Sequence, residues 1–266
     1  VVDVDDAVPR TFMTCANASN LHLFRSENGI AGLIDSFPPA CNVIVHTAVN
    51  VKSAWFRRHV DDVVNEVLVL RKFLNAAFNR GVEKFIFVSS VMARVPFDTS
   101  LVVDENTSFG GSNKLFNGVG DLYELLEREV DHANACGLQT VILEHGHVVG
   151  AHGVDGTAAL SLALCRGEIP FSASNTVPFT DAAELGRAAF ASASVDGGSG
   201  ETFIVVTDIR SWAKFFDLTL QFCGRGKGAL ESLFEFDGIW SKLIGLRGLF
   251  YELTRRGVEH PLCLPQ

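Results

Sequence analysis

Four short apolar segments that do not alternate with polar residues constrain the fold of this chain more than any other feature. They span residues 43–45, 85–88, 140–143 and 203–206, and valine, isoleucine, leucine and phenylalanine make up nearly all of them. Strands buried on both faces of a parallel sheet have this character, whereas a strand with one wet face alternates. The pattern therefore predicts four buried strands.

Segments of helical period separate these strands. In residues 60–79 apolar residues recur at steps of three and four, and the segment stops before Gly81, a residue suited to a helix C-terminus. Residues 121–136 repeat the pattern and stop before Gly137. Strand, helix, glycine and strand in this order are typical of right-handed βαβ units. The chain is predicted to be an α/β protein with a doubly wound, Rossmann-like parallel sheet.

The residue pattern changes near position 151. Residues 1–150 are predicted to form a Rossmann-like domain of the dinucleotide-binding type. Residues 151–266 are predicted to form a smaller, mostly helical cap, with a strand near 202–207 that joins the sheet. The chain starts without Met, and no glycine-rich loop follows a first strand. We expect that this strand and loop either precede Val1 or have been lost.

Composition excludes several classes of function. A net charge of −9 provides no basic surface for nucleic acid, and no apolar run reaches the roughly 20 residues of a transmembrane helix. The six cysteines are scattered singly, without a C-x-x-C pair, which favours a reducing intracellular compartment, cytoplasm or mitochondrial matrix. For the apolar segment 239–253, packing or a protein partner is favoured over peripheral contact with a membrane.

Four motifs follow one another in a recognisable order. Residues 42–48 read N-V-I-V-H-T-A, and residues 76–90 contain a helix end A-A-F-N-R-G-V before a strand ending in S-S. Residues 137–150 are similar to V-I-L-R-P-x-N-V-Y-G, and residues 177–185 to V-x-V-x-D-L-A. In this order the motifs resemble the extended short-chain dehydrogenase/reductases, an NAD-dependent epimerase/dehydratase family, and within it the 3β-hydroxysteroid dehydrogenase-like branch.

The resemblance implies a ligand site at the carboxyl ends of the strands, where doubly wound sheets bind dinucleotides. The positions that it assigns to NAD(P) binding are Thr47, Ala48, Ser89, Gly146 and His147. In this family a tyrosine moves the substrate proton, and a lysine four residues later lowers the pKa of that tyrosine and holds the nicotinamide ribose. A serine at the end of a strand binds the reacting oxygen, and Ser90 takes that position.

The tyrosine and the lysine are missing from their places. Counting back from the third motif, the family's Y-x-x-x-K-x-x-x-E falls on Val119, Tyr123 and Glu127. A shift by one helical turn puts Tyr123 at the tyrosine position, but Glu127 then replaces the lysine and would raise the pKa of the tyrosine. Tyr251 is the only other tyrosine. Ser90 is thus predicted to be vestigial, and Tyr123 is the remaining candidate acid.

Three further patterns are interpreted conservatively. Glu144, His145, His147 and His152 lack the spacing of a known metal site, so no metal is expected. The loop 224–228 is glycine-rich but lacks a G-K-[ST] ending, which favours a plain loop. Asp3 or Asp5 would bind a ribose if residues 1–6 form the second strand, although a solvated acidic cluster is favoured.

Two functions follow from the resemblance. The favoured one is a degenerate, non-catalytic NAD(P)-binding-fold protein with a weakened or lost cofactor site. It would serve as an accessory subunit of a larger complex, as in the mitochondrial respiratory NADH dehydrogenase, or form a homo-oligomer. The alternative is an active NAD(P)-dependent oxidoreductase of the 3β-hydroxysteroid dehydrogenase or dihydroflavonol reductase type. The missing Tyr-x-x-x-Lys favours the first.

Overall fold

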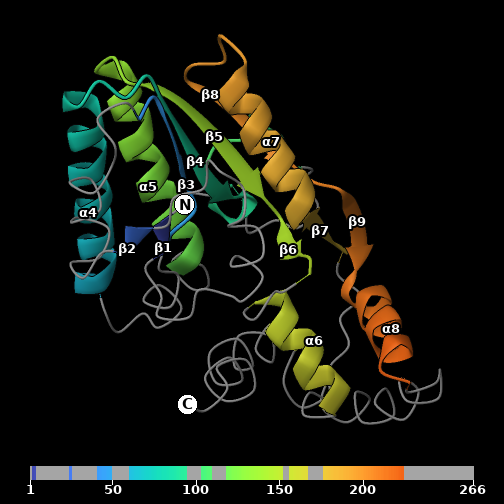
Figure 1. Ribbon diagram of the computed structural model, residues 1–266. Helices are drawn as coiled ribbons and strands as arrows, with labels where there is room; N and C mark the ends of the chain where they lie inside the picture. The colour runs from blue at the N-terminus through green and yellow to red at the C-terminus, as the bar shows by residue number, and fades with distance from the viewer. Residues whose placement is uncertain are drawn as a thin grey trace. The chain divides into compact units, whose positions relative to one another are not determined.

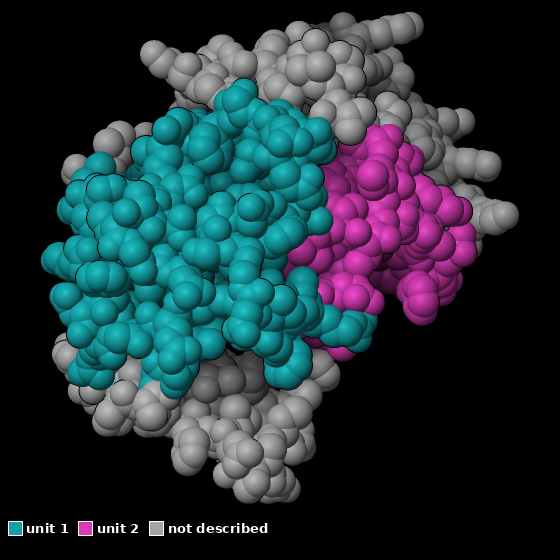
Figure 2. Space-filling view, turned by 90° about the horizontal axis from the view of Figure 1, so that it is seen from above, with its two compact units in different colours: residues 1–144, 187–204 teal, residues 145–186, 205–266 magenta. Residues whose placement is uncertain are grey.

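The computed structural model describes residues 2–3, 24–25, 41–49, 60–94, 103–109, 118–151, 156–166 and 176–224. The chain forms two compact units (Figure 2). Unit 1 comprises residues 1–144 and 187–204, and unit 2 comprises residues 145–186 and 205–266. The chain therefore returns to unit 1 after its first passage through unit 2.

Unit 1 is built on a four-stranded sheet in the order β3-β4-β5-β8. Its strands are β3 (Val43–His46), β4 (Lys84–Ser90), β5 (Gln139–His145) and β8 (Glu201–Val205). β3 and β4 are parallel, with Ile44 opposite Phe85, and all seven residues of β4 are buried. The four predicted strands and the α/β class are confirmed. A separate parallel pair joins β1 (Val2–Asp3) and β2 (Phe24–Arg25).

Two long helices cover this sheet in unit 1. α4 (Val60–Asn79) and α5 (Gly118–Ala135) lie side by side (Figure 1) and share one core with β3, β4 and β5. Each helix ends next to a glycine in the left-handed region, Gly81 at φ +73° and Gly137 at φ +104°. A side chain is strained at such angles. The predicted helix ends are therefore confirmed. A short 3₁₀ helix, η2 (Val91–Ala93), follows β4.

Another helix, α7 (Ala182–Ser194), ends in unit 1 beside the first residue of β4. The buried Lys84 donates hydrogen bonds from Nζ to the carbonyl oxygens of Ser192 (3.1 Å) and Val195 (2.5 Å). The last carbonyls of a helix lack partners within the helix. The Lys84 ammonium group donates to carbonyls at this helix end, and these bonds connect the end of α7 to the sheet.

Unit 2 contains α6 (Thr157–Arg166), α8 (Trp212–Phe222) and a three-stranded sheet in the order β6-β7-β9. The strands are β6 (His147–Val149), β7 (Thr176–Asp181) and β9 (Asp208–Ser211), with β7 parallel to β6 and antiparallel to β9. Sequence analysis predicted a mostly helical region here. These strands are short and mix polar with apolar residues, so they carry no clear strand pattern.

A disulfide joins Cys165 at the end of α6 to Cys223 after α8, with a Cα–Cα separation of 5.8 Å. The two cysteines are 58 residues apart, and their spacing contained no signal for a bond. Packing of Leu164 against Phe216 and Leu220 in the core of unit 2 brings the two helix ends together.

Several sequence predictions lie outside the described residues. These concern Asp5, His152, the loop that continues after Gly224, and the apolar segment 239–253. Asp3 is opposite Arg25 in the β1–β2 pair. Of the helices that the structure describes, none combines the length and the apolar character needed to cross a bilayer.

Candidate active-site region

The carboxyl ends of β3 and β4 bring four of the predicted site residues to one edge of the unit 1 sheet. His46, the last residue of β3, is opposite Phe87 of the parallel β4. Thr47 and Ala48 follow directly, with Thr47 exposed and Ala48 partly buried. Ser89 and Ser90 end β4 at the same edge. The expected clustering of these positions is therefore present.

Ser90 uses its hydroxyl to start the turn after β4. The side chain is 4% exposed, and its Oγ accepts a hydrogen bond from the Met92 backbone N–H (3.3 Å) as the N-terminal cap of η2. Serine is a preferred residue at such caps because its oxygen replaces a missing backbone acceptor. The retained serine thus has a structural role in this chain.

Ser89 points into a group of buried charged side chains. Its Oγ donates a hydrogen bond to Oε1 of Glu127 on α5. Arg94, just after η2, donates from Nε to Oε1 of Glu144 on β5 (2.5 Å), and its Nη2 lies 3.9 Å from Oε2 of Glu127. Ser89, Glu127 and Glu144 are fully buried, and Arg94 is 7% exposed. We call these four residues the buried charge cluster.

Arg94 also holds the segment 103–109. Its Nη1 donates to the carbonyl oxygens of Glu105 (3.2 Å) and Thr107 (2.6 Å). The ring of Phe109 lies 5.2 Å from the guanidinium carbon, a distance at which a cation is attracted to an aromatic face. The guanidinium thus connects the charge cluster to a surface segment.

The two carboxyl groups of the cluster are shifted toward the neutral form. Burial, followed by the charge of Glu144, raises the pKa of Glu127 to about 8, against the lowering effects of Ser89 and Arg94. Burial also raises the pKa of Glu144, but its direct bond to Arg94 opposes the shift. At neutral pH the stable arrangement is a protonated Glu127 beside an ionised Glu144. Sequence analysis missed this cluster; its one signal was Glu144, where the family motif V-I-L-R-P has arginine.

Tyr123 lies in the hydrophobic core of unit 1. It is 7% exposed and packs in the same cluster as Val119, which is 5% exposed. Burial, then the charges of Glu127 and Glu66, raises the pKa of Tyr123 to about 12. The predicted effect of Glu127 on the tyrosine is thus present. In neither alignment of the helix does a lysine lie one turn after a tyrosine.

Gly146 and His147 belong to unit 2, where both have a packing role. A Cβ at Gly146 would lie 2.4 Å from the carbonyl oxygen of Pro178, so only glycine fits beside β7. The His147 ring packs edge-on against Trp212 at 4.7 Å, and burial, then the charge of His145, lowers its pKa to about 4. The described residues include no group of three histidine, cysteine or acidic side chains that could hold a metal ion.

His46 is a buried polar residue at the end of β3. Its ring lies among Phe73, Phe85 and Phe87, with centroid distances of 5.7 to 5.9 Å. Neither ring nitrogen has a hydrogen-bond partner among the described residues, and burial lowers its pKa to about 4. The imidazole is therefore neutral, with one N–H buried in aromatic surroundings.

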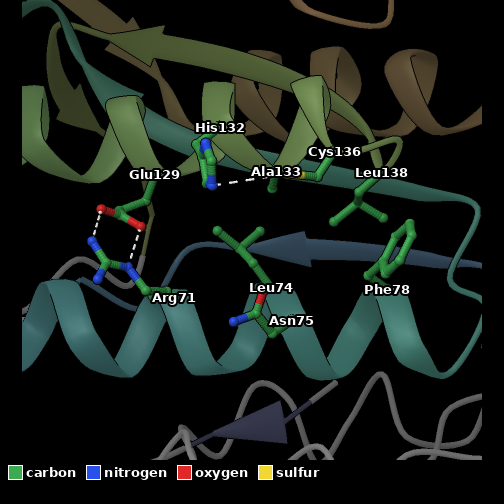
Figure 3. Close-up of a pocket in the computed structure, with 9 residues that line it drawn as sticks. All are labelled: Arg71, Leu74, Asn75, Phe78, Glu129, His132, Ala133, Cys136 and Leu138. Atoms are coloured by element: carbon green, nitrogen blue, oxygen red, sulfur yellow. Dashed lines mark hydrogen bonds and ion pairs between the residues drawn. The ribbon is translucent and has the colours of Figure 1, made fainter.

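A shallow groove between α4 and α5 contains none of the predicted site residues (Figure 3). Arg71 and Glu129 form an ion pair there (2.5 Å), and the Cys136 sulfur lies 3.8 Å from Nε2 of His132. Leu138, which also lines the groove, directly precedes β5. Sheets of this type bind ligands at the carboxyl ends of their strands, so this groove does not correspond to the predicted cofactor edge.

The fold implies an NAD(P) site. In the family that the sequence resembles, the part of that site which holds the nicotinamide ribose contains a lysine one helical turn after the tyrosine. Tyr123 or Glu127 takes the lysine position, depending on the alignment, and Ser89 is bonded to Glu127. The side chains described at this edge therefore do not fit the nicotinamide ribose.

Comparison with known proteins defines the fold. No protein-family model and no curated protein sequence matches this chain. Among solved structures, gox2253 is similar with a TM-score of 0.67 and 19% identity over 79% of this chain. The match covers 64% of that protein, so this chain spans less than two thirds of its length.

Two solved epimerases are also similar. A nucleoside-diphosphate-sugar epimerase from Pseudomonas aeruginosa matches with a TM-score of 0.67 and 15% identity, over 89% of this chain and 74% of that one. A UDP-glucuronic acid 4-epimerase from Bacillus cereus, solved with UDP-glucuronic acid and NAD, matches with 0.66 and 18%, over 84% and 75%. At these identities the likeness concerns architecture alone, and the chain has the Rossmann-like fold that these solved epimerases share.

Proposed function

We propose that this chain is a non-catalytic protein with an NAD(P)-binding fold, serving as an accessory or structural subunit. The observation that carries the proposal is the burial of Tyr123 in the core with Glu127 one turn later, which raises the pKa of the phenol to about 12. A proton donor works best when its pKa lies near the pH of the reaction. The pKa of the Tyr123 phenol is raised away from neutral pH, so this phenol does not meet that requirement.

The serines support the same proposal. Ser90 caps η2, and Ser89 is bonded to a buried carboxyl group. The Ser89 hydroxyl would have to leave the buried carboxyl group of Glu127 to reach a substrate oxygen, and a buried carboxyl left without its donor is costly. The Ser90 oxygen is held in the cap by the hydrogen bond that it accepts from the Met92 backbone N–H. The positions that carry chemistry in this family are used here to stabilise the fold.

We further propose a weakened cofactor site. The similar epimerase from Bacillus cereus was solved with NAD and UDP-glucuronic acid, so the fold is suited to a dinucleotide. In this chain Tyr123 or Glu127 takes the position of the lysine that holds the nicotinamide ribose in the family, and His147 packs against Trp212. Any remaining affinity would come from the adenosine half.

An accessory role requires a surface for a partner, either another protein or a second copy of this chain. Large apolar side chains between 42% and 49% exposed on α4 and α5 are suited to this role: Val64, Leu68, Phe78 and Leu125. Light scattering on the purified chain would test self-association. A monomer at all accessible concentrations would leave only a different protein as the partner.

Titration with NADH and NADPH, followed by nucleotide fluorescence and thermal shift, tests the proposal directly. We expect weak or no binding. We also expect no turnover of UDP-glucuronic acid, a ketosteroid or a dihydroflavonol. Turnover that Tyr123→Phe abolishes would overturn the non-catalytic proposal and favour the oxidoreductase alternative. Asp121→Asn, an exposed change on the same helix outside the proposed partner surface, is the control that should leave any turnover unaltered.

A further inference from the structure

The two carboxyl groups of the buried charge cluster each keep one oxygen without a hydrogen-bond donor among the described residues. Ser89 occupies Oε1 of Glu127, and Arg94 occupies Oε1 of Glu144. Oε2 of each carboxyl has no hydrogen-bond partner among the described residues. We propose that one proton, shared between these two oxygens, makes the cluster a pH-sensitive latch that holds the segment 103–109 and loosens in mildly alkaline solution.

Geometry places the proton on Glu127. Oε1 of Glu144 accepts a direct bond from the Arg94 guanidinium (2.5 Å), whereas Oε2 of Glu127 lies 3.9 Å from it, so Glu144 keeps the negative charge and Glu127 the proton. A proton on Oε2 of Glu127, donated to Oε2 of Glu144, satisfies both orphaned oxygens with a single bond. Two ionised carboxylates would instead face each other without water, an arrangement that buried sites avoid by retaining a proton.

The charge balance leads to the same conclusion. Within the cluster, Arg94 supplies one positive charge against two carboxyl groups. One retained proton makes the cluster neutral, whereas its loss leaves one uncompensated negative charge in a region almost closed to water. Among the described residues, the other ionisable groups around the cluster are Glu66 on α4, Tyr123, Arg128 and Asp131 on α5, and Glu105 in the segment 103–109. The one cation among them, Arg128, is exposed and already paired with Glu124 (2.8 Å), so it does not replace the lost proton.

Arg94 transmits the change to the segment 103–109. In the protonated state its Nη1 is free to hold the carbonyl oxygens of Glu105 and Thr107. When both carboxylates are charged, the guanidinium is drawn toward Glu127, 3.9 Å away, at the expense of these bonds. Glu105 also accepts a hydrogen bond from the Ile204 backbone N–H of β8 (3.1 Å), so loosening would reach that strand.

The direction of the pH dependence follows from linkage. Glu127 in the folded chain holds its proton up to about pH 8, far above the ordinary value of a glutamate. Its contribution to stability is therefore complete at low pH and is lost as pH rises to that value. Buried His46 and His147 act in the opposite direction only below about pH 6.5, where the unfolded chain takes up protons.

Urea unfolding between pH 6.5 and 9 tests the latch. We expect the unfolding equilibrium constant of the wild-type chain to rise about tenfold per pH unit up to about pH 8 and then level off. Glu127→Gln keeps a donor toward Glu144 and an acceptor for Ser89 without a titrating proton, so its stability should be flat. Glu129→Gln changes a partly buried carboxyl on the same helix whose pKa is lowered by Arg71, and it should keep the wild-type slope. The same slope in Glu127→Gln would overturn the proposal.

Infrared difference spectra test the proposal on the wild-type chain alone, so the result does not depend on whether a variant folds. Between pH 6.5 and 9 the wild-type chain should lose the carbonyl band of one protonated carboxyl group, and its absence at pH 6.5 would overturn the proposal. Hydrogen exchange, corrected for its intrinsic pH dependence, should accelerate at residues 103–109 over the same range. No acceleration would contradict the latch. These tests involve no cofactor or partner, so their outcome is independent of the proposed function.

Discussion

Glu127 and Glu129 lie two residues apart on α5, yet their surroundings shift them in opposite directions. Glu127 is fully buried beside another carboxyl group, and its pKa is raised to about 8. Glu129 is only partly buried and is paired with Arg71, whose hydrogen bonds lower its pKa. A glutamate therefore keeps its proton at neutral pH at position 127 and is an ionised ion-pair partner at position 129.

His46 supports a prediction for a single residue. We expect His46→Leu to stabilise the chain by about 1 kcal/mol at pH 7.5, because it removes a buried N–H that has no partner in the described part of the chain and retains an apolar contact among phenylalanines. Urea unfolding measures the change. His46→Ala should instead cost about 2 kcal/mol or more, because it opens a cavity. If His46→Leu destabilises the chain, the imidazole has a partner beyond the described residues.

Among the secondary-structure elements, α7 shows how a helix end is secured from a distant part of the chain. Lys84 donates hydrogen bonds to the carbonyl groups of Ser192 in the last turn of α7 and of Val195 directly after it, and precedes these residues by 108 and 111 positions. A lysine at the start of a buried strand had no evident role in the sequence. The element it serves is formed by residues that come much later.

We expect Lys84→Met to destabilise the chain by about 1–3 kcal/mol, because it leaves two carbonyl oxygens without a donor while keeping the apolar stem. Hydrogen exchange should accelerate at the C-terminal end of α7 more than in β4. Lys72→Met, on the exposed side of α4, is the matched control and should change stability by less than about 0.5 kcal/mol. Equal effects of the two substitutions would refute the capping role.

The molecule as a whole consists of two units whose chain segments alternate in sequence. Unit 1 has a core of sheet and helices without a covalent link among its described residues, with Cys41 and Cys136 as free thiols. Unit 2 has a smaller aromatic core, and a disulfide joins two of its helices. The stabilities of the two units should therefore respond differently to reductants.

Reduction should lower the stability of unit 2 by about 2–4 kcal/mol, because the Cys165–Cys223 bond closes a long loop. Thermal unfolding with and without dithiothreitol measures this, and intact mass after thiol alkylation counts the free cysteines. Cys165→Ser should reproduce the effect of the reductant and be insensitive to it. Full alkylation without reductant would show that the bond is absent in solution and would favour the predicted reducing compartment.

The sequence alone was sufficient for the four strands, the two long helices and their glycine ends, because these depend on residues close together in the chain. Apolar runs such as 85–88 and the steps of three and four in 60–79 are local patterns. The sequence also identified the missing Tyr-x-x-x-Lys, since this motif lies within one helix. The edge where Thr47 and Ser90 meet followed from the parallel order of the strands.

The tertiary structure decided which side chains share a buried environment. Arg94 and Glu144 are separated by 50 residues, and Ser89 and Glu127 by 38, so no local pattern joins them. Burial then sets their charge, because the cost of an ion depends on the water that folding removes. The proton on Glu127, the helix cap from Lys84 and the bond between Cys165 and Cys223 therefore became visible only when distant segments were brought together.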